Sequence, residues 1–263
     1  MRLLKFIDHF WRLVATTLSF IVFGVGGLIM GVLVFPLLFV FVRDSERRKF
    51  TARRLVGKAF GGFWEMMRVM RILDYKIEGA EHIDDTRNQL IVANHPTLID
   101  VVILTSLFPR ANCVIKGAVT RNLFMRSVVR AADYISNSQP EELLGSCVAY
   151  LQSGGSLMLF PEGTRSRAGE GLVFKPGAAT VAARTGVAVL PVVIRCNPLF
   201  LTKELPWYFV PATRPRFTIR VLPPCSTSEL ADGGLSERVR RQQLNESLRE
   251  RIGSELKRME FSA

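Results

Sequence analysis

The chain has 263 residues, 48% of them hydrophobic, which is enough to form one domain with a full hydrophobic core. Its formal net charge of +12 predicts an anionic partner, such as a membrane surface, an acidic substrate or an acidic carrier protein. Nucleic acid is not favoured, because the sequence lacks zinc-finger spacing, an RNP-like aromatic motif and a long basic tract.

Histidine and cysteine are both sparse and scattered. His9, His82 and His95 stand in three different sequence contexts, which argues against a three-histidine metal site. The four cysteines form no CxxC pair, and a chain of this length does not depend on disulfides. We therefore expect reduced, packed thiols, which suit a cytoplasmic domain.

The first long apolar segment, Leu13 to Val42, contains no charged residue and has basic residues on both sides. It is too long for a signal peptide, and about twenty helical residues already span a bilayer, so it predicts membrane attachment. Its glycines and Pro36 favour a re-entrant pair of short helices, while a single span and a buried helix of a soluble core are the alternatives. The Gly27-x-x-x-Gly31 spacing suits close helix packing.

From about Asp74 onward, short apolar strands alternate with amphipathic helices. The expected strands are Tyr75–Glu78, Leu90–Ala93, Cys113–Lys116, Tyr134–Ser136, Ser156–Phe160, Val187–Ile194 and Phe217–Leu222. The expected helices lie near Ile99–Leu107, Asn122–Ala131, Glu141–Leu151, Ala178–Thr185 and Ser236–Met259, the last with Ser236 as its N-cap. The pattern predicts an α/β domain, a mixed sheet flanked by helices, at residues 61–263, after a membrane-associated helical segment with a basic flank at residues 1–60.

The first polar cluster follows the apolar strand that ends at Ala93. Asn94 and His95 emerge at the carboxyl end of this strand, where α/β sheets place ligands. Pro96 fits the first turn of a helix, so His95 is expected just outside the helix that carries Asp100. The imidazole can then fold back so that Asp100 accepts the Nδ1 hydrogen, which leaves Nε2 available as a base. A satisfied structural histidine is the alternative.

The second polar cluster follows a later apolar strand. Gly163 lets a ligand approach the backbone, Thr164 offers a hydroxyl, and Arg165 offers the bidentate fork suited to phosphate. Lys175 adds a positive charge just before a predicted helix whose N-terminus favours anions. Glu162 is expected to brace Arg165 or the hydroxyls of a ligand. A tight turn with an exposed arginine is the alternative.

Together the two clusters resemble the glycerolipid acyltransferase family, typified by 1-acyl-glycerol-3-phosphate (lysophospholipid) acyltransferases. Residues 94–100, Asn-His-Pro-Thr-Leu-Ile-Asp, look like its His-x4-Asp catalytic motif, and residues 160–166, Phe-Pro-Glu-Gly-Thr-Arg-Ser, look like its acceptor-binding motif. Phe174–Gly177 and Val187–Val193 are similar to its downstream signatures. The resemblance covers roughly residues 75–222, and two long motifs in the right order make a chance match improbable.

The resemblance implies an acyl donor on coenzyme A or acyl carrier protein, a lysophospholipid-like acceptor and an N-terminal helical pair seated on the membrane. We assign catalysis to His95 and Asp100. The residues assigned to substrate binding are Asn94, Thr97, Lys116, Glu162, Gly163, Thr164, Arg165 and Lys175.

The middle motif departs from the family pattern. Lys116 is kept, but residues 131–138 contain no arginine where the family has one that helps to hold the acceptor phosphate. Arg121, Arg126 and Arg130 are candidates to replace it.

The stretch Asn197–Pro215 is rich in proline and aromatic residues. It is compatible with a loop that dips into the membrane and with a wall of an acyl-binding site. Ordinary core packing of most of its residues is the third reading.

These features predict direct acyl transfer to a hydroxyl of a lysophospholipid, by default 1-acylglycerol-3-phosphate, with His95 as general base and Asp100 stabilising the imidazolium. The sequence has no Gly-x-Ser-x-Gly elbow, so an acyl-enzyme intermediate is not expected, and neither is a metal or another cofactor. The expected partners are membrane phospholipid and the acyl carrier, without nucleic acid, and the catalytic domain is expected on the cytoplasmic side of the inner membrane. A non-catalytic lipid-binding protein and an acyl hydrolase on the same fold are the alternatives.

Overall fold

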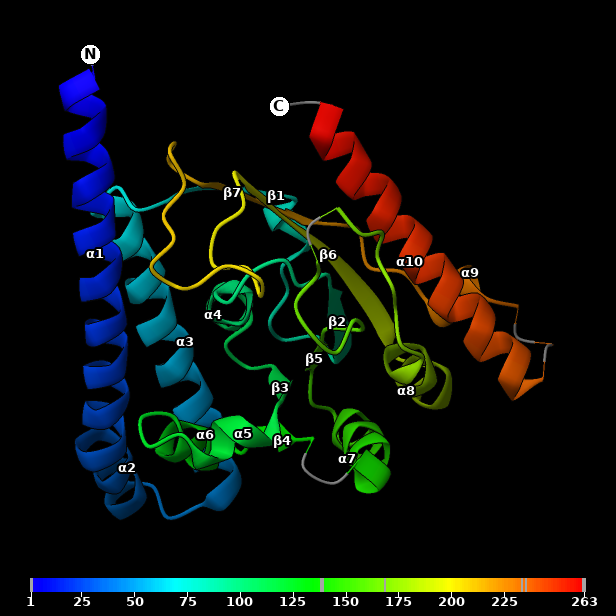
Figure 1. Cartoon of the computed structure of the whole chain (residues 1–263). Helices are drawn as coiled ribbons and strands as arrows, with labels where there is room; N and C mark the ends of the chain where they lie inside the picture. The colour runs from blue at the N-terminus through cyan, green and yellow to red at the C-terminus, as the bar shows by residue number, and fades with distance from the viewer. Residues whose placement is uncertain (1, 138–139, 168, 233, 235, 262–263) are drawn as a thin grey trace.

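The computed structural model describes residues 2–137, 140–167, 169–232, 234 and 236–261. Its N-terminal part is one helical rod, in which α1 (Arg2–Ile29), a π-helical turn (Met30–Val34) and α2 (Phe35–Phe41) follow without interruption (Figure 1). Within the described residues, Phe6–Phe41 is the one helical segment that is apolar and long enough to cross a membrane, by length and composition. The apolar segment is therefore a continuous rod and not two short helices.

The π-helical turn explains how the rod continues through Pro36. A proline ring inside a regular α-helix clashes with the carbonyl four residues before it and removes one hydrogen bond. Here the Phe35 N–H donates to the Met30 carbonyl, five residues back, so the helix is widened directly before the proline.

The basic flank of the rod is itself a helix. Asp44 caps α3 (Ser45–Val69) by accepting the Arg47 N–H at 2.7 Å, and α3 runs back alongside the rod (Figure 1). Its buried face packs against α4 (Asp100–Leu107). Residue 60, the predicted domain boundary, lies inside this helix.

In the described part of the chain, seven strands form one mixed sheet in the order β1-β7-β6-β2-β5-β3-β4. The strands are β1 (Asp74–Glu78), β2 (Gln89–Ala93), β3 (Asn112–Ile115), β4 (Ile135–Ser136), β5 (Leu157–Leu159), β6 (Ala188–Asn197) and β7 (Arg216–Val221). β6 and β7 run antiparallel, and the other neighbouring pairs are parallel. Each predicted strand is present within a few residues, and the predicted fold class is confirmed.

Helices cover both faces of the sheet (Figure 1). Along β2, Ile91 and Ala93 point to a core cluster with α3 and α4, whereas Leu90 and Val92 point to a cluster on the opposite face. Helices α7 (Pro140–Gln152), α8 (Gly177–Thr185) and α10 (Glu237–Phe261) cover that second face. The other helices of the domain are α5 (Gly117–Arg121), α6 (Arg126–Ala132) and α9 (Thr227–Leu230), with a 3-10 turn at Ala80–His82.

The helices differ from the predictions mainly at their ends. The helix predicted at Asn122–Ala131 begins at Arg126, because the Asn122 side chain accepts the Phe124 N–H and closes a turn there. The last helix begins after Ser236, as predicted. The short helices α5 and α9 were not predicted. The four cysteines are free and buried.

One side of the rod carries closely spaced glycines that receive the turn before α6. A Cβ built at Gly27 lies 2.5 Å from the Phe124 carbonyl oxygen, and one at Gly31 lies 2.7 Å from Ser127 Cβ. A Cβ at Gly24 is in ordinary contact with the Phe124 ring. The predicted close packing at small residues is therefore present, but the partner is the turn before α6 and the start of α6, not a second apolar helix.

Gly27→Ala is expected to destabilise the protein by about 1–3 kcal/mol, because the added methyl group overlaps the Phe124 carbonyl. Gly26→Ala is the matched control, since a Cβ at Gly26 meets nothing within 4 Å. Thermal unfolding of both variants in one detergent measures the difference. Equal melting temperatures would contradict the tight contact.

Candidate active site

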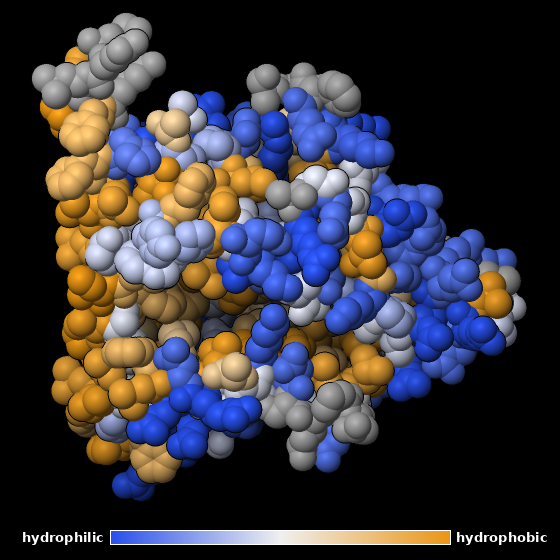
Figure 2. All heavy atoms as spheres, in the orientation of Figure 1, coloured by the Kyte–Doolittle hydropathy of each residue, from blue (hydrophilic) through white to orange (hydrophobic). Residues whose placement is uncertain are grey.

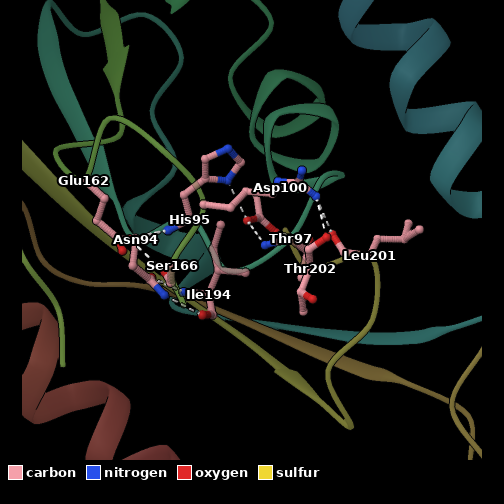
Figure 3. Close-up of polar contacts among 10 residues, drawn as sticks. Asn94, His95, Thr97, Asp100, Glu162, Ser166, Ile194, Leu201 and Thr202 are labelled. Atoms are coloured by element: carbon pink, nitrogen blue, oxygen red, sulfur yellow. Dashed lines mark hydrogen bonds and ion pairs between the residues drawn. The ribbon is translucent and has the colours of Figure 1, made fainter. Parts of the chain in front are cut away.

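The two polar clusters meet at one edge of the sheet. β2 and β5 are parallel neighbours, with Val92 paired to Leu159 near their carboxyl ends. The loops that follow them, residues 94–99 and 160–166, therefore leave the sheet side by side (Figure 3).

His95 is oriented by a buried carboxylate. Its Nδ1 lies 2.8 Å from Oδ2 of Asp100, which is the first residue of α4 and is fully buried. Asp100 also accepts the N–H of Thr97 at 2.7 Å and the Thr97 hydroxyl (Figure 3). Because an ionised carboxylate can only accept, this contact favours the tautomer with the proton on Nδ1, which leaves Nε2 free to accept a hydrogen bond. The predicted fold-back of His95 is present.

A second carboxylate fixes the backbone of His95. Glu162 Oε1 accepts the His95 N–H at 2.8 Å and the Ser166 hydroxyl at 2.9 Å. The Ser166 N–H in turn donates to the His95 carbonyl at 2.7 Å. Glu162 thus braces the catalytic loop, whereas the sequence suggested that it braces Arg165 or a ligand hydroxyl.

Two further residues of the second motif touch His95 and were not among the predicted site residues. The Phe160 ring stacks on the imidazole at 4.3 Å between centroids, and Ser166 forms the bonds just described. Both lie inside the motif, but their roles depend on how the two loops pack, and no spacing rule encodes that.

Burial raises the pKa of the Glu162 carboxyl above its usual value, which the two accepted hydrogen bonds only partly oppose.

Asn94 and Arg165 are both tied to backbone. The buried Asn94 amide exchanges two hydrogen bonds of 2.8 Å with the N–H and C=O of Ile194 on β6. Arg165 Nη1 donates to the carbonyls of Leu201, at 3.1 Å, and Thr202, at 2.6 Å. Asn94 therefore holds the catalytic loop to the sheet, and the Arg165 guanidinium has a fixed position.

A cavity of ≈ 650 Å³ lies beside His95. The predicted site residues that line it are His95, Lys116, Gly163, Thr164, Arg165 and Lys175. The others, Asn94, Thr97, Asp100 and Glu162, hold the lining residues from behind. Apolar side chains from α1, α3, α4, α7 and α8 form most of the remaining wall, including Phe20, Phe23, Phe60, Phe63, Leu144 and Val181.

The charged side chains among the described lining residues are all positive: Lys116, Arg165 and Lys175. The carboxylates of Asp100 and Glu162 are covered behind them. An anionic group is therefore favoured at the polar end, and a hydrocarbon chain fits the apolar wall. The cavity suits an amphipathic molecule with an anionic head.

Gly163 allows a tight turn after β5, in which its N–H donates to the Phe160 carbonyl at 3.0 Å. Its φ is 68°, in the left-handed region that favours glycine. The Lys175 side chain lies against it, since a Cβ at Gly163 would be 3.2 Å from Nζ. A side chain here would displace a cation of the cavity wall.

The three arginines proposed to replace the missing middle-motif arginine lie elsewhere. Arg121, Arg126 and Arg130 are exposed, and among the described residues none of them lines the cavity. Asn137 lines it instead, and its Oδ1 accepts the Gly117 N–H at 2.9 Å, next to Lys116.

The sequence and the fold both have known relatives. Residues 74–195 match the family model described as Acyltransferase. The chain is 32% identical over 163 residues to a chloroplastic 1-acyl-sn-glycerol-3-phosphate acyltransferase of Arabidopsis thaliana, covering 59% of this chain and 44% of the relative. It is 28% identical over 197 residues to a 1-acyl-sn-glycerol-3-phosphate acyltransferase of Saccharomyces cerevisiae, covering 70% of this chain and 63% of the relative.

The fold of the chain matches a crystal structure of the 1-acyl-sn-glycerophosphate acyltransferase PlsC from Thermotoga maritima, with a TM-score of 0.75 at 22% identity, over 95% of this chain and 98% of that chain. The chain spans about half the length of the curated relatives it matches. Residues 74–195 of the α/β domain are thus similar to the acyltransferase family, as the two motifs predicted.

Comparing Glu162→Gln with Glu162→Ala is expected to show whether Glu162 acts through its hydrogen bonds to the His95 loop or through its negative charge. Glutamine keeps an oxygen that accepts from His95 and Ser166, so it should preserve folding and most activity. Alanine leaves two donors without a partner and should cost about 1–3 kcal/mol.

The same pair has a pH signature. Because the folded pKa of Glu162 is raised, its contribution to stability is complete at acidic pH and is lost as pH rises through that pKa. The melting temperature of the glutamine variant relative to the parent should therefore increase from acidic to neutral pH. Equal damage by glutamine and alanine would show that the charge itself is required.

Proposed function

We propose that this protein transfers a fatty acyl group from an acyl thioester to a hydroxyl of a lysophospholipid-like acceptor, with 1-acylglycerol-3-phosphate as the first candidate. The observation that carries the proposal is the His95–Asp100 pair at 2.8 Å, placed beside an apolar cavity whose charged lining is cationic. The names of the two curated relatives support the same chemistry.

The proposed step is direct. The acceptor oxygen attacks the thioester carbonyl carbon while His95 Nε2 takes its proton, and Asp100 stabilises the imidazolium. The tetrahedral intermediate then collapses, the carbon–sulfur bond breaks, and the departing sulfur takes the proton from His95. The thioester is already activated and His95 handles the proton, so the step requires neither a metal nor a cofactor.

The cations of the cavity are assigned to the acceptor head. Arg165 is fixed by the Leu201 and Thr202 carbonyls, so it can present charge without a large loss of side-chain entropy. Lys116 and Lys175 add two further positive charges to the wall of the same cavity. Coenzyme A and acyl carrier protein both fit as the donor, because both are anionic and the chain carries +12.

We propose that the helical rod lies in one leaflet of the membrane. A 36-residue helix is about 54 Å long, well beyond the roughly 30 Å of a bilayer core. The α/β domain packs along the rod through Phe124 and Ser127, so an upright rod would draw the domain into the bilayer. An in-plane rod leaves its exposed apolar side to lipid (Figure 2). In this proposal the domain lies on the cytoplasmic side of the inner membrane.

His95→Ala is expected to lower the rate of acyl transfer by roughly 10²–10⁴-fold, the contribution that a general base typically makes. His82→Ala is the control, because His82 lies in the 3-10 turn after β1 and outside the cavity lining. Labelled acyl-CoA and acyl carrier protein, each with and without lysophosphatidate, are the substrates, and products are identified by mass. Near-normal turnover of the His95 variant would rule out the mechanism.

The same assay separates the other functions of this fold. Release of free fatty acid with no dependence on acceptor would indicate a hydrolase. Binding of acyl thioester without any product would indicate a lipid-binding protein.

Arg165→Ala is expected to raise the KM for the acceptor about tenfold, the equivalent of roughly 1.4 kcal/mol, with little change in the KM for the donor. Arg121→Ala is the matched control, an arginine that is exposed and outside the cavity lining. Steady-state kinetics with each substrate varied in turn measure both constants. An unchanged acceptor KM would remove the role assigned to Arg165.

A further inference from the structure

The segment between β6 and β7, residues 198–215, exposes three successive aromatic side chains. Trp207, Tyr208 and Phe209 are 45%, 58% and 45% exposed. The same segment contributes Leu201 to the cavity wall, while these three aromatics lie outside the described lining. They are therefore not a wall of the acyl site, and core packing does not account for them either.

This segment is fastened to the apolar rod by a buried arginine. Arg12 of α1 is fully buried and donates to the carbonyls of Pro211 at 2.8 Å, Ala212 at 2.8 Å and Thr213 at 3.2 Å. Its Nε also pairs with Asp8 at 3.0 Å. A charge inside an apolar helix is costly unless its donors are satisfied, and here backbone carbonyls of the segment satisfy them.

The aromatics themselves adjoin the rod. The Trp207 ring packs edge-to-face on Phe20 of α1 at 5.3 Å, and Tyr208 packs on Trp207 at 5.7 Å. Figure 1 shows the segment, in yellow to gold, running beside the blue rod, and Figure 2 shows hydrophobic residues along the length of that rod. The aromatics thus reach α1 at the partly buried Phe20, next in the chain to the exposed Ile21 and Val22.

We propose that Trp207, Tyr208 and Phe209 form an aromatic tip that enters the interfacial layer of the phospholipid bilayer next to α1, as a second lipid contact of this protein. The proposal rests on the proposed membrane position of the rod. Tryptophan and tyrosine suit this layer because their rings are apolar at one end and polar at the other. Their position beside α1, whose neighbouring residues Ile21 and Val22 are exposed and apolar, selects a lipid surface as the partner.

The tip is also connected to the candidate active site. The carbonyls of Leu201 and Thr202, in the same segment, hold Arg165, and the Leu201 carbonyl accepts the Leu98 N–H at 2.9 Å. Lipid contact at residues 207–209 therefore holds the cavity against the surface from which an amphipathic acceptor arrives.

Depth-dependent quenching tests the contact directly. The full chain contains Trp11, Trp64 and Trp207, so Trp11→Phe with Trp64→Phe leaves Trp207 as the single reporter. The chain is reconstituted in vesicles of phosphatidylcholine and phosphatidylglycerol that carry lipid brominated high on the acyl chain. We expect several-fold stronger quenching of Trp207 than of the buried Trp64 in the matched variant Trp11→Phe with Trp207→Phe.

Two outcomes of this experiment would overturn the proposal. Quenching of Trp207 by aqueous acrylamide with no effect of brominated lipid would place the tip in water. Protection from both quenchers would place it against protein, for example a second copy of the chain.

A kinetic test separates docking from catalysis. Replacing Trp207, Tyr208 and Phe209 together by serine is expected to raise the apparent KM for a long-chain acceptor in vesicles about tenfold, while activity on short-chain, water-soluble substrates is unchanged. Val239→Ser on α10, which removes a similarly exposed apolar side chain, is the control. An equal loss of activity with the water-soluble substrates would overturn the proposal. The reaction itself is tested separately by His95→Ala, which is expected to be inactive with vesicle-bound and water-soluble substrates alike.

Discussion

The buried Asp100 carboxylate is the constraint on which the candidate site depends. A charge removed from water must be fully hydrogen-bonded, and here three donors converge on it: the His95 ring, the Thr97 amide and the Thr97 hydroxyl. Meeting those three bonds fixes the loop after β2 and the orientation of the imidazole together. Two further buried side chains fix the same loop: Asn94 holds it to β6, and Glu162 holds its backbone to the loop after β5.

The site separates its charges by depth. Its carboxylates lie behind the cavity wall, where they are satisfied by protein donors, and its cations lie in the wall. A ligand in the cavity therefore meets both positive charge and hydrocarbon, and the described lining residues offer it no carboxylate. This division suits a lipid acceptor, because the acyl chain gains from burial while the head group gains from charge.

Much of the sheet was predictable because its strands are short apolar runs with polar ends. The position of the His95–Asp100 pair was predictable too, since the end of a strand is a local signal, although the helix begins at Asp100 and not at Pro96. The roles of Asn94 and Glu162 were not. Their partners are 100 and 67 residues away in the sequence, so only the packed loops reveal that they support His95 and do not face a ligand. The role of Arg12 was not predictable for the same reason, because its carbonyl partners lie about 200 residues further along the chain.

The apolar segment shows what composition alone misses. Hydropathy predicted only a membrane element. In the structure, its glycines also pack against the turn before α6, and its residues Phe20 and Phe23 line the cavity. The segment is thus part of the wall as well as an anchor. An unrelated span of equal length and hydropathy would still bring the domain to a membrane, but it would leave the turn unseated and the cavity open on one side. In this molecule the proposed anchor and the α/β domain therefore share a packing surface and one wall of the cavity.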